Sequence, residues 1–239
     1  NDIHSNQLLV EKKIGEYLKV QPNEKLLEIG CGCGAIADHM SNNTLCHVTG
    51  INIDKETIQK GKDELALKKN NNVNLVYADM NEKLPFDDSS FDGVYNIQAM
   101  TFSNNLESLF KEINRVLKPG KRMVIMDGMI LDNFDKKNPK DIERFIETQK
   151  VCCGGGWWHP KYWENAGEKA GFKVITSTCG DKYKGQYANE LPILIEADNY
   201  YHRIKMVTKI LAKCRILPEH IPKLLERLCE GSAGLIELC

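Results

Sequence analysis

The sequence predicts an α/β fold, a doubly wound and mostly parallel Rossmann-like sheet with helices on both faces and a helical C-terminal extension. Five short apolar segments alternate with helical segments over the first 130 residues. These segments are apolar throughout, which is typical of parallel strands that are buried on both faces. A glycine-rich turn joins the first of them to the next helix. Sheets of this class bind ligands at the carboxyl ends of their strands, near the point where the strand order reverses.

The elements follow from the spacing of apolar residues. Strands are expected at residues 25–29, 46–53, 73–78, 91–98 and 122–128, with a sixth at 173–179. Helices are expected at residues 4–18, 35–40, 54–70, 106–117, within 131–150, at 161–172 and twice within 198–229. Asp54 is expected to cap its helix. The first helix should bury one face made of Leu8, Leu9, Ile14, Tyr17 and Leu18.

Length and composition limit the class of protein. The chain has 239 residues, of which 42% are hydrophobic, which suffices for one sizeable domain over residues 1–180. Residues 181–239 are expected to form a mainly helical extension that serves as an acceptor pocket or an oligomer face. A formal net charge of −1 gives no field that favours nucleic acid. No apolar run is long enough to span a bilayer and no signal peptide is visible, so a cytoplasmic protein is expected.

Nine cysteines are present, an odd number with irregular spacing. Close pairs occur as C-x-C or C-C, and the C-x-x-C pairs of a zinc site do not occur. Free thiols in a reducing compartment are therefore expected, and no metal site.

The glycine turn has the spacing Gly30-x-Gly32-x-Gly34. A dinucleotide-binding turn is spaced G-x-G-x-x-G and presents its helix N-terminus to a pyrophosphate. Here the third glycine comes one residue early, and Glu28 would repel a pyrophosphate. Glu28 suits a cationic ligand instead, such as the ammonium group of an amino-acid moiety, which disfavours an NAD-type enzyme.

Polar residues also end the next two strands. Asn52 stands where a ribose partner is expected, and Asp79 can accept a hydrogen bond from an adenine amino group. With the stretches "LLEIGCGCG", "VTGINID", "VYADMNEKLPFDDSSFDGVYNIQA" and "EINRVLKPGKRMVIMD", the sequence resembles the class I S-adenosylmethionine-dependent methyltransferases. The resemblance covers roughly residues 20–180 and implies S-adenosyl-L-methionine as cofactor and S-adenosyl-L-homocysteine as product.

The resemblance also implies which residues surround the cofactor. Those expected near its methionine part are Glu28, Gly30, Cys31, Gly32 and Gly34. Asn52 would meet the ribose, while Ile53, Asp79 and Met80 would hold the adenine. Asn96 and Ile97, at the end of the fourth strand, complete the set. Cys31 and Cys33 are expected to act through their backbone because both lie in a tight turn.

Two stretches resemble the sterol C-methyltransferase group in particular: "GINID", with Asn52 where most members carry an acid, and "VYNIQAMTFSNNLESLFKEINRVLKPG". The chain departs from that group at Gln98, where the group has glutamate, and at Phe102, where it has histidine. Lys121 replaces the second glycine of its "KPGG" turn. Gln98, Tyr95 and Phe102 are the expected acceptor-side residues, although neither Gln98 nor Phe102 can serve as a base.

Aromatic residues suit an acceptor that passes through a cationic intermediate. The candidates are Tyr95, Phe102, Trp157, Trp158 and Trp163. The stretch "GGGWWHP" reads either as a lid over the acceptor or as loop packing. His159 and Asp127 are further titratable groups, for which a solvated loop and a polar strand end are the simpler interpretations.

The expected function is methyl transfer from S-adenosylmethionine to a sterol-like or other lipophilic small-molecule acceptor. The alternatives are a catalytically silent, cofactor-binding regulatory subunit and a methyltransferase for a non-sterol small molecule. In a further alternative, an arsenite methyltransferase, Cys152 and Cys153 would be the only candidate thiols for binding arsenic. Residues 200–217 combine apolar and basic side chains, which leaves open a homo-oligomer or peripheral contact with an internal membrane.

Overall fold

The computed structural model of the chain describes residues 3–130, 132, 134–152 and 158–177. Its sheet consists of β1 (Lys25–Ile29), β2 (His47–Asn52), β3 (Val73–Tyr77), β4 (Phe91–Ile97) and β5 (Leu117–Met126). Its helices are α1 (Ile3–Leu18), α2 (Ala35–Thr44), α3 (Lys55–Lys68), the 3₁₀ turn η1 (Met100–Phe102), α4 (Leu106–Val116), α5 (Pro139–Cys152) and α6 (Pro160–Lys169). Two compact units divide the chain, one of residues 7–131 with 155–178, which contains the sheet, and one of the remaining residues.

The sheet is parallel throughout and its strands lie in the order β3-β2-β1-β4-β5. Strands β2 and β3 therefore extend the sheet on one side of β1, and β4 and β5 extend it on the other side. Glu28 lies beside Gly50 of β2 and Tyr95 of β4 in this register. The expected α/β fold is confirmed, and the reversal of strand order lies between β1 and β4, where such sheets bind ligands.

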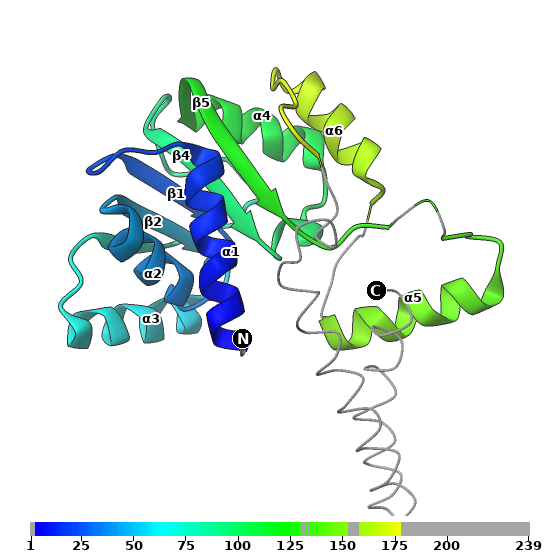
Figure 1. The fold of residues 1–239 in the computed structure, drawn as a ribbon, viewed down its shortest axis with the longest axis horizontal. Coiled ribbons are helices and arrows are strands. Elements are labelled where there is room, and N and C mark those ends of the chain that lie inside the picture. The colour runs from blue at the N-terminus through cyan, green and yellow to red at the C-terminus, as the bar shows by residue number, and fades with distance from the viewer. Residues whose placement is uncertain (1–2, 131, 133, 153–157, 178–239) are drawn as a thin grey trace, which may run out of the picture. The chain divides into compact units, whose positions relative to one another are not determined.

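Helices cover both faces of the sheet (Figure 1). Leu26, Val48 and Tyr95 pack on one face with residues of α1 and α2, and α3 adds a smaller cluster around Leu75. On the other face α4 and α6 cover the strands, and five apolar residues of α4 are buried as its sequence predicts: Leu106, Leu109, Phe110, Ile113 and Val116. Two apolar layers therefore hold the sheet, and its carboxyl edge carries the loops.

The N-terminal helix buries only part of the expected stripe, together with one residue that was not expected. Ile14 and Leu18 are buried, but Leu9 is 52% exposed. The buried residue one turn before Ile14 is Glu11, which has no exposed surface. Residues at spacings of three and four share a helix face, so Glu11, Ile14 and Leu18 form the stripe against the sheet. The prediction is confirmed for Ile14 and Leu18 and wrong for Leu9, and it missed Glu11 because it excluded a charged residue from the core.

Two strand predictions also need correction. The strand expected at residues 122–128 is β5, which starts earlier, at Leu117, and ends at Met126. The "KPG" stretch therefore lies inside it, and an irregularity in the β4–β5 pairing absorbs the extra residues. Residues 173–177, expected to begin a sixth strand, are not in a strand, and Ile175 is 68% exposed. The expected helices within 198–229, like the boundary at residue 180, lie outside the described residues.

The second unit contributes α5 to the described residues. The helix expected within 131–150 is thus confirmed, and Phe134 contacts Phe145 with ring centroids 5.6 Å apart. No helix in the described part of the chain is long and apolar enough to cross a membrane.

Candidate functional site

The parallel sheet brings the carboxyl ends of all five strands to one edge. The glycine turn follows β1, Asn52 ends β2, Asp79 follows β3, Gln98 follows β4 and Asp127 follows β5. Residues that are up to 97 positions apart in the sequence, from Gly30 to Asp127, therefore share one edge of the sheet. Asp54 caps α3 as expected, with its carboxylate accepting hydrogen bonds from the Glu56 N–H (2.9 Å) and the Thr57 hydroxyl (2.6 Å).

Left-handed backbone geometry shapes the glycine turn. Gly30, Gly32 and Gly34 have φ values of 76°, 54° and 82°, which glycine adopts without steric cost. A Cβ at Gly30 would lie 2.1 Å from Ala99 Cβ, whereas a Cβ at Gly32 would meet no heavy atom within 4 Å. Gly30 is therefore required for close packing, and the turn is open to a ligand above Gly32.

Backbone hydrogen bonds hold part of this turn and leave part of it available. The N–H groups of Gly30 and Cys31 both donate to the Ile51 carbonyl, and the Gly34 N–H donates to the Cys31 carbonyl. Within the described residues, the N–H groups of Gly32 and Cys33 have no backbone acceptor. Because α2 begins at Ala35, these donors lie at a helix N-terminus, where polar groups of a ligand bind readily.

The two cysteines of the turn differ in burial: Cys31 is buried and Cys33 is half-buried. Burial raises the pKa of the Cys31 thiol. A neutral, buried thiol is a poor nucleophile and a poor metal ligand. The Cys33 carbonyl oxygen lies 2.3 Å from where a Cβ on Gly61 would be, so α3 packs directly against the turn. No group of His, Cys, Asp and Glu side chains in the described residues could hold a metal ion.

Glu28 is buried on the face of the sheet that α1 and α2 cover. It is 1% exposed, and its carboxylate accepts a hydrogen bond from the Tyr95 hydroxyl at 3.0 Å. Burial raises the pKa of Glu28 to about 8, against the lowering effect of the Tyr95 hydrogen bond, and the nearby Glu11 raises it further. Glu28 is therefore mostly protonated at pH 7 while no cation lies beside it.

A second acidic side chain adjoins this one. Glu11 of α1 is fully buried, and its carboxylate lies 3.4 Å from Nδ1 of His39 on α2. Sequence reasoning missed Glu11, although its spacing of three and seven residues from Ile14 and Leu18 places it on the buried stripe. Two buried acidic side chains, from β1 and α1, thus lie near each other.

The ends of β2 and β3 present the residues expected to bind a nucleoside. Asn52 is half-buried, and Ile53 is 57% exposed. Oδ1 of Asp79 accepts hydrogen bonds from the backbone N–H (2.8 Å) and the side-chain amide (3.1 Å) of Asn81. Within the described residues Oδ2 of Asp79 makes no such bond. Met80 is half-buried beside a surface hollow of about 400 Å³ that reaches the first turns of α4.

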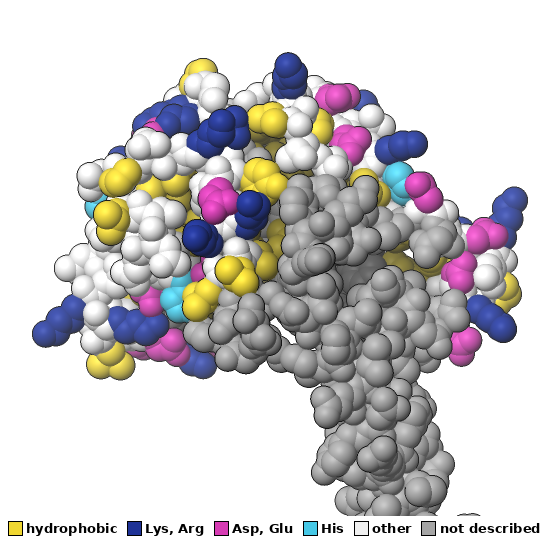
Figure 2. Space-filling view, in the orientation of Figure 1, with side chains coloured by type: hydrophobic (Ala, Val, Ile, Leu, Met, Phe, Trp, Pro, Cys, Tyr) yellow, Lys and Arg dark blue, Asp and Glu magenta, His cyan; other side chains and the backbone are white. Residues whose placement is uncertain are grey.

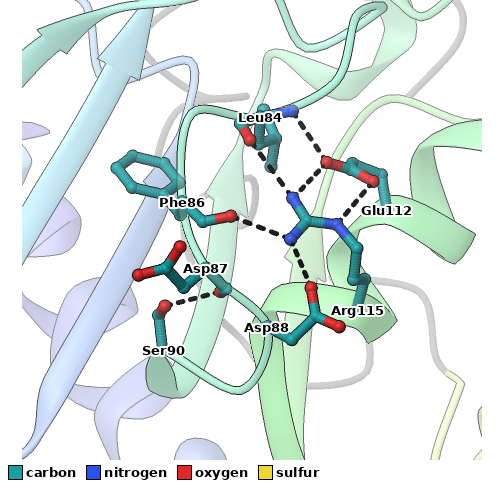
Figure 3. Close-up of polar contacts among 7 residues, drawn as sticks. All are labelled: Leu84, Phe86, Asp87, Asp88, Ser90, Glu112 and Arg115. Carbon is teal, nitrogen blue, oxygen red and sulfur yellow. Dashed lines mark hydrogen bonds and ion pairs between the residues drawn. The ribbon is translucent and has the colours of Figure 1, made fainter.

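An arginine of α4 fixes the loop that leads from β3 to β4 (Figure 3). The Arg115 guanidinium donates to the carbonyls of Leu84 (3.1 Å) and Phe86 (2.8 Å) and pairs with Glu112 and Asp88. The Glu112 carboxylate also accepts the Leu84 N–H at 2.7 Å. This network ties the loop that contains Met80 to α4, and the composition of "LPFDDSS" did not predict it.

Of the three expected acceptor-side residues, Gln98 and Phe102 are exposed, whereas Tyr95 is buried. Tyr95 has no exposed surface and its hydroxyl points to Glu28, so it presents nothing to an acceptor in this structure. Gln98 is exposed with φ 56°, and Phe102 is 49% exposed. Asn96 is buried and donates from Nδ2 to the Ile29 carbonyl at 3.2 Å, and Ile97 is buried beside it.

The aromatic residues after β5 fall into two groups. Trp163 is 4% exposed and packs on Phe110, so it belongs to the core. Trp158 is partly buried, stacks on Tyr162 at 5.7 Å between centroids, and accepts the Ile130 N–H through its carbonyl. Trp157 lies outside the described residues, and so does most of the stretch "GGGWWHP" for which a lid or loop packing is expected. His159 caps α6 by accepting the Lys161 N–H at 3.2 Å.

Comparison with known proteins was made for both sequence and fold. Residues 27–125 match the family described as "Methyltransferase domain". The chain is 32% identical to sterol methyltransferase-like 1 of Botryococcus braunii, over 91% of this chain and 56% of that protein. It is 34% identical to a sterol 24-C-methyltransferase of Gibberella zeae, over 95% of this chain and 64% of that protein. The chain thus spans about half to two thirds of the length of these relatives.

Solved structures share the fold. A phosphoethanolamine N-methyltransferase 2 of Haemonchus contortus has a TM-score of 0.69 at 20% identity, over 97% of this chain and 49% of that one. A geranyl diphosphate C-methyltransferase of Streptomyces coelicolor has a TM-score of 0.60 at 18% identity, over 68% of this chain and 60% of that one. At these identities the similarity establishes the fold alone.

Proposed function

Because this chain carries a class I methyltransferase domain and resembles the sterol C-methyltransferases, we propose that it transfers a methyl group from S-adenosylmethionine to a lipophilic small-molecule acceptor. The observation that carries the proposal is the open glycine turn at the reversal of strand order. The two relatives described above are named for sterols, which is why a sterol or a similar polycyclic or isoprenoid alkene is the acceptor class that we propose.

The residues around the turn fit the shape and polarity of the cofactor. The N–H groups of Gly32 and Cys33 would bind its carboxylate, because they have no backbone acceptor in the described part of the chain and lie before α2. The half-buried Asn52 would bind the ribose hydroxyls. Ile53 and Met80 would enclose the adenine ring, and Oδ2 of Asp79 would accept its amino group. Each of these assignments is a role that substitution can test.

When bound, the cofactor supplies a methyl group on a positively charged sulfur, and the methyl group is transferred to the acceptor by in-line displacement. The protein's task is then to place the acceptor atom in line with that group and to exclude water. The exposed Gln98 and Phe102 lie at the edge of the sheet from which an acceptor would approach. Because the Gln98 amide cannot take up a proton, a reaction that ends in deprotonation needs a base from another residue.

We propose that Glu28 carries negative charge near the cofactor's ammonium group. Its pKa of about 8 means that the unliganded protein holds about 0.9 proton on this carboxyl at pH 7. An adjacent ammonium group favours the ionised carboxylate, so binding should expel that proton. Proton release on binding therefore reports the pairing directly and does not depend on finding the acceptor.

Isothermal titration calorimetry at pH 7, in phosphate and in Tris, measures both binding and proton release. The expected result is S-adenosylmethionine binding with release of about 0.9 proton by the unaltered protein. Glu28→Gln should release none and bind at least tenfold more weakly, while Glu64→Gln on the exposed face of α3 serves as the control. Binding without proton release would refute the pairing, and no binding at all would refute the proposed cofactor.

The acceptor is tested by transfer of a labelled methyl group to a panel of sterols, linear isoprenoid alkenes and polar amines. Product mass and the position of the label identify the methylated atom. We expect transfer to the sterols or isoprenoids and none to the amines. Transfer to amines alone would overturn the lipophilic acceptor. Binding of the cofactor without transfer to any member would favour the catalytically silent alternative.

A further inference from the structure

The segment that follows β4 is held in an unusual conformation. Gln98 has φ 56°, a left-handed geometry that costs a non-glycine residue about 1–2 kcal/mol. Ala99 then packs against Gly30, so closely that no side chain fits on that glycine. The next three residues form the 3₁₀ turn η1, in which Met100 and Thr101 are buried and Phe102 is half-exposed.

The end of β5 supplies what holds this conformation. The Met126 carbonyl accepts the Gln98 N–H at 2.8 Å. Oδ2 of Asp127 accepts the N–H groups of Met100 (2.8 Å) and Thr101 (3.3 Å), and Oδ1 accepts the N–H of Gly128 at 2.9 Å. The first N–H groups of a 3₁₀ turn have no acceptor inside the turn, so the carboxylate satisfies donors that would otherwise be unpaired.

The carboxylate is ionised under ordinary assay conditions. Burial raises the pKa of Asp127 to about 6, while its backbone donors, which include Ala99, lower it. At pH 8 the side chain is therefore an anion that accepts hydrogen bonds and donates none, which matches a ring of N–H groups.

We propose that Asp127 is a positioning residue, which holds residues 98–102 so that Gln98 and Phe102 face the acceptor beside the cofactor turn. The inference rests on the proposed function for its effect on catalysis, but the positioning itself is a property of the unliganded chain. The segment contacts the glycine turn through Ala99 and β5 through Asp127, so a single carboxylate links the cofactor side to the acceptor side.

The test is Asp127→Asn, which keeps the size of the side chain and replaces one acceptor oxygen with a donor. An N–H group that faces the new amide nitrogen loses its partner. At pH 8, amides of residues 98–103 should exchange hydrogen at least tenfold faster than in the unaltered protein, measured without ligand by mass spectrometry. Asp63→Asn, on the exposed face of α3, is the matched control and should leave that exchange unchanged.

The catalytic consequence is a fall in kcat of tenfold to a hundredfold, with the Kd of S-adenosylmethionine unchanged within threefold. An unchanged exchange rate at residues 98–103 would overturn the proposal, and so would a loss of cofactor affinity as large as the loss in kcat. If no acceptor is ever methylated, the proposed function fails, while the exchange measurement still decides the role of Asp127.

The unaltered protein provides a second measurement that needs no folded variant. Amide exchange followed by NMR should show protection of Met100 and Thr101 at pH 8. Among the described residues these amides donate to no backbone carbonyl, and the Asp127 carboxylate is the acceptor that the structure gives them. Exchange of both at the rate of an unstructured peptide would overturn the proposal.

Discussion

Replacing Glu28 by glutamine should change how the stability of the protein depends on pH. Glu28 is buried and its pKa is about 8, against 4.5 for the same group in an unfolded chain. Between these two values the folded protein binds more protons than the unfolded chain. The free energy of unfolding contributed by this group is therefore greatest below pH 4.5 and falls as the pH rises to 8.

The magnitude follows from the difference between the two pKa values. Each unit is worth 1.36 kcal/mol, so the full difference corresponds to about 5 kcal/mol, of which about 3 kcal/mol falls between pH 5.5 and 8.5. Glutamine keeps the size of the side chain and an acceptor for the Tyr95 hydroxyl, but it does not ionise. Glu28→Gln should therefore gain about 3 kcal/mol on the unaltered protein over that range.

Urea denaturation at a series of pH values, without ligand, measures this gain. Subtracting the two proteins cancels the contributions of other titrating groups, and Glu64→Gln controls for the loss of one carboxylate from the surface. Parallel stability profiles for the unaltered protein and Glu28→Gln would refute the reasoning, because Glu28 would then titrate alike in the folded and unfolded states.

Three further pairs of substitutions test the structure around the site. Gly30→Ala should unfold the domain or lower its stability by more than about 3 kcal/mol, because the new Cβ would lie 2.1 Å from Ala99 Cβ. Gly32→Ala should lower stability by only about 1 kcal/mol, yet weaken S-adenosylmethionine binding at least tenfold. Thermal melting measures the stability and calorimetry the binding, and equal effects of the two substitutions would contradict the open turn. Arg115→Ala should lower stability by about 2 kcal/mol and speed proteolysis within residues 84–90. Asp88→Asn, at a side chain that is 78% exposed, should change stability by less than about 0.5 kcal/mol. A loop that stays resistant to protease in Arg115→Ala would argue against the network. Gln98→Glu should raise the rate of methylation of alkene acceptors, because the carboxylate can act as a base. Gln98→Asn keeps the amide and tolerates the positive φ, so it should leave that rate unchanged. Equal methylation rates in both variants would exclude a base at this position.

Most of the fold could be predicted because its signals are local. The first four strands, the Asp54 cap and the buried face of α4 each depend on a few adjacent residues, and each occurs where expected. The predictions were wrong where contacts between distant parts of the chain determine which residues are buried. Glu11 is buried where α2 places His39 beside its carboxylate, and this partner is not visible within the N-terminal segment.

The candidate site was predictable in its positions and less so in its contacts. The strand ends identify Gly32, Asn52 and Asp79, because every strand of a parallel sheet ends at the same edge. The role of Asp127 depends on N–H groups that are 26 and 27 residues away, and the pairing of Glu28 with Tyr95 spans 67. Spacing within a motif cannot reveal such partners, since they depend on which strands become neighbours.

The pairing of β1 with β4 also bears on how the chain folds. These neighbours in the sheet are separated by 67 residues at Glu28 and Tyr95, so their contact forms only after a long loop has closed. The glycine turn becomes complete at that step, because Ala99 packs on Gly30 only when β4 is in place. A ligand that binds there favours the closed chain over partly folded forms with an unpaired β1 edge. The supply of cofactor would thereby influence how much of the newly made chain reaches the folded state and escapes aggregation.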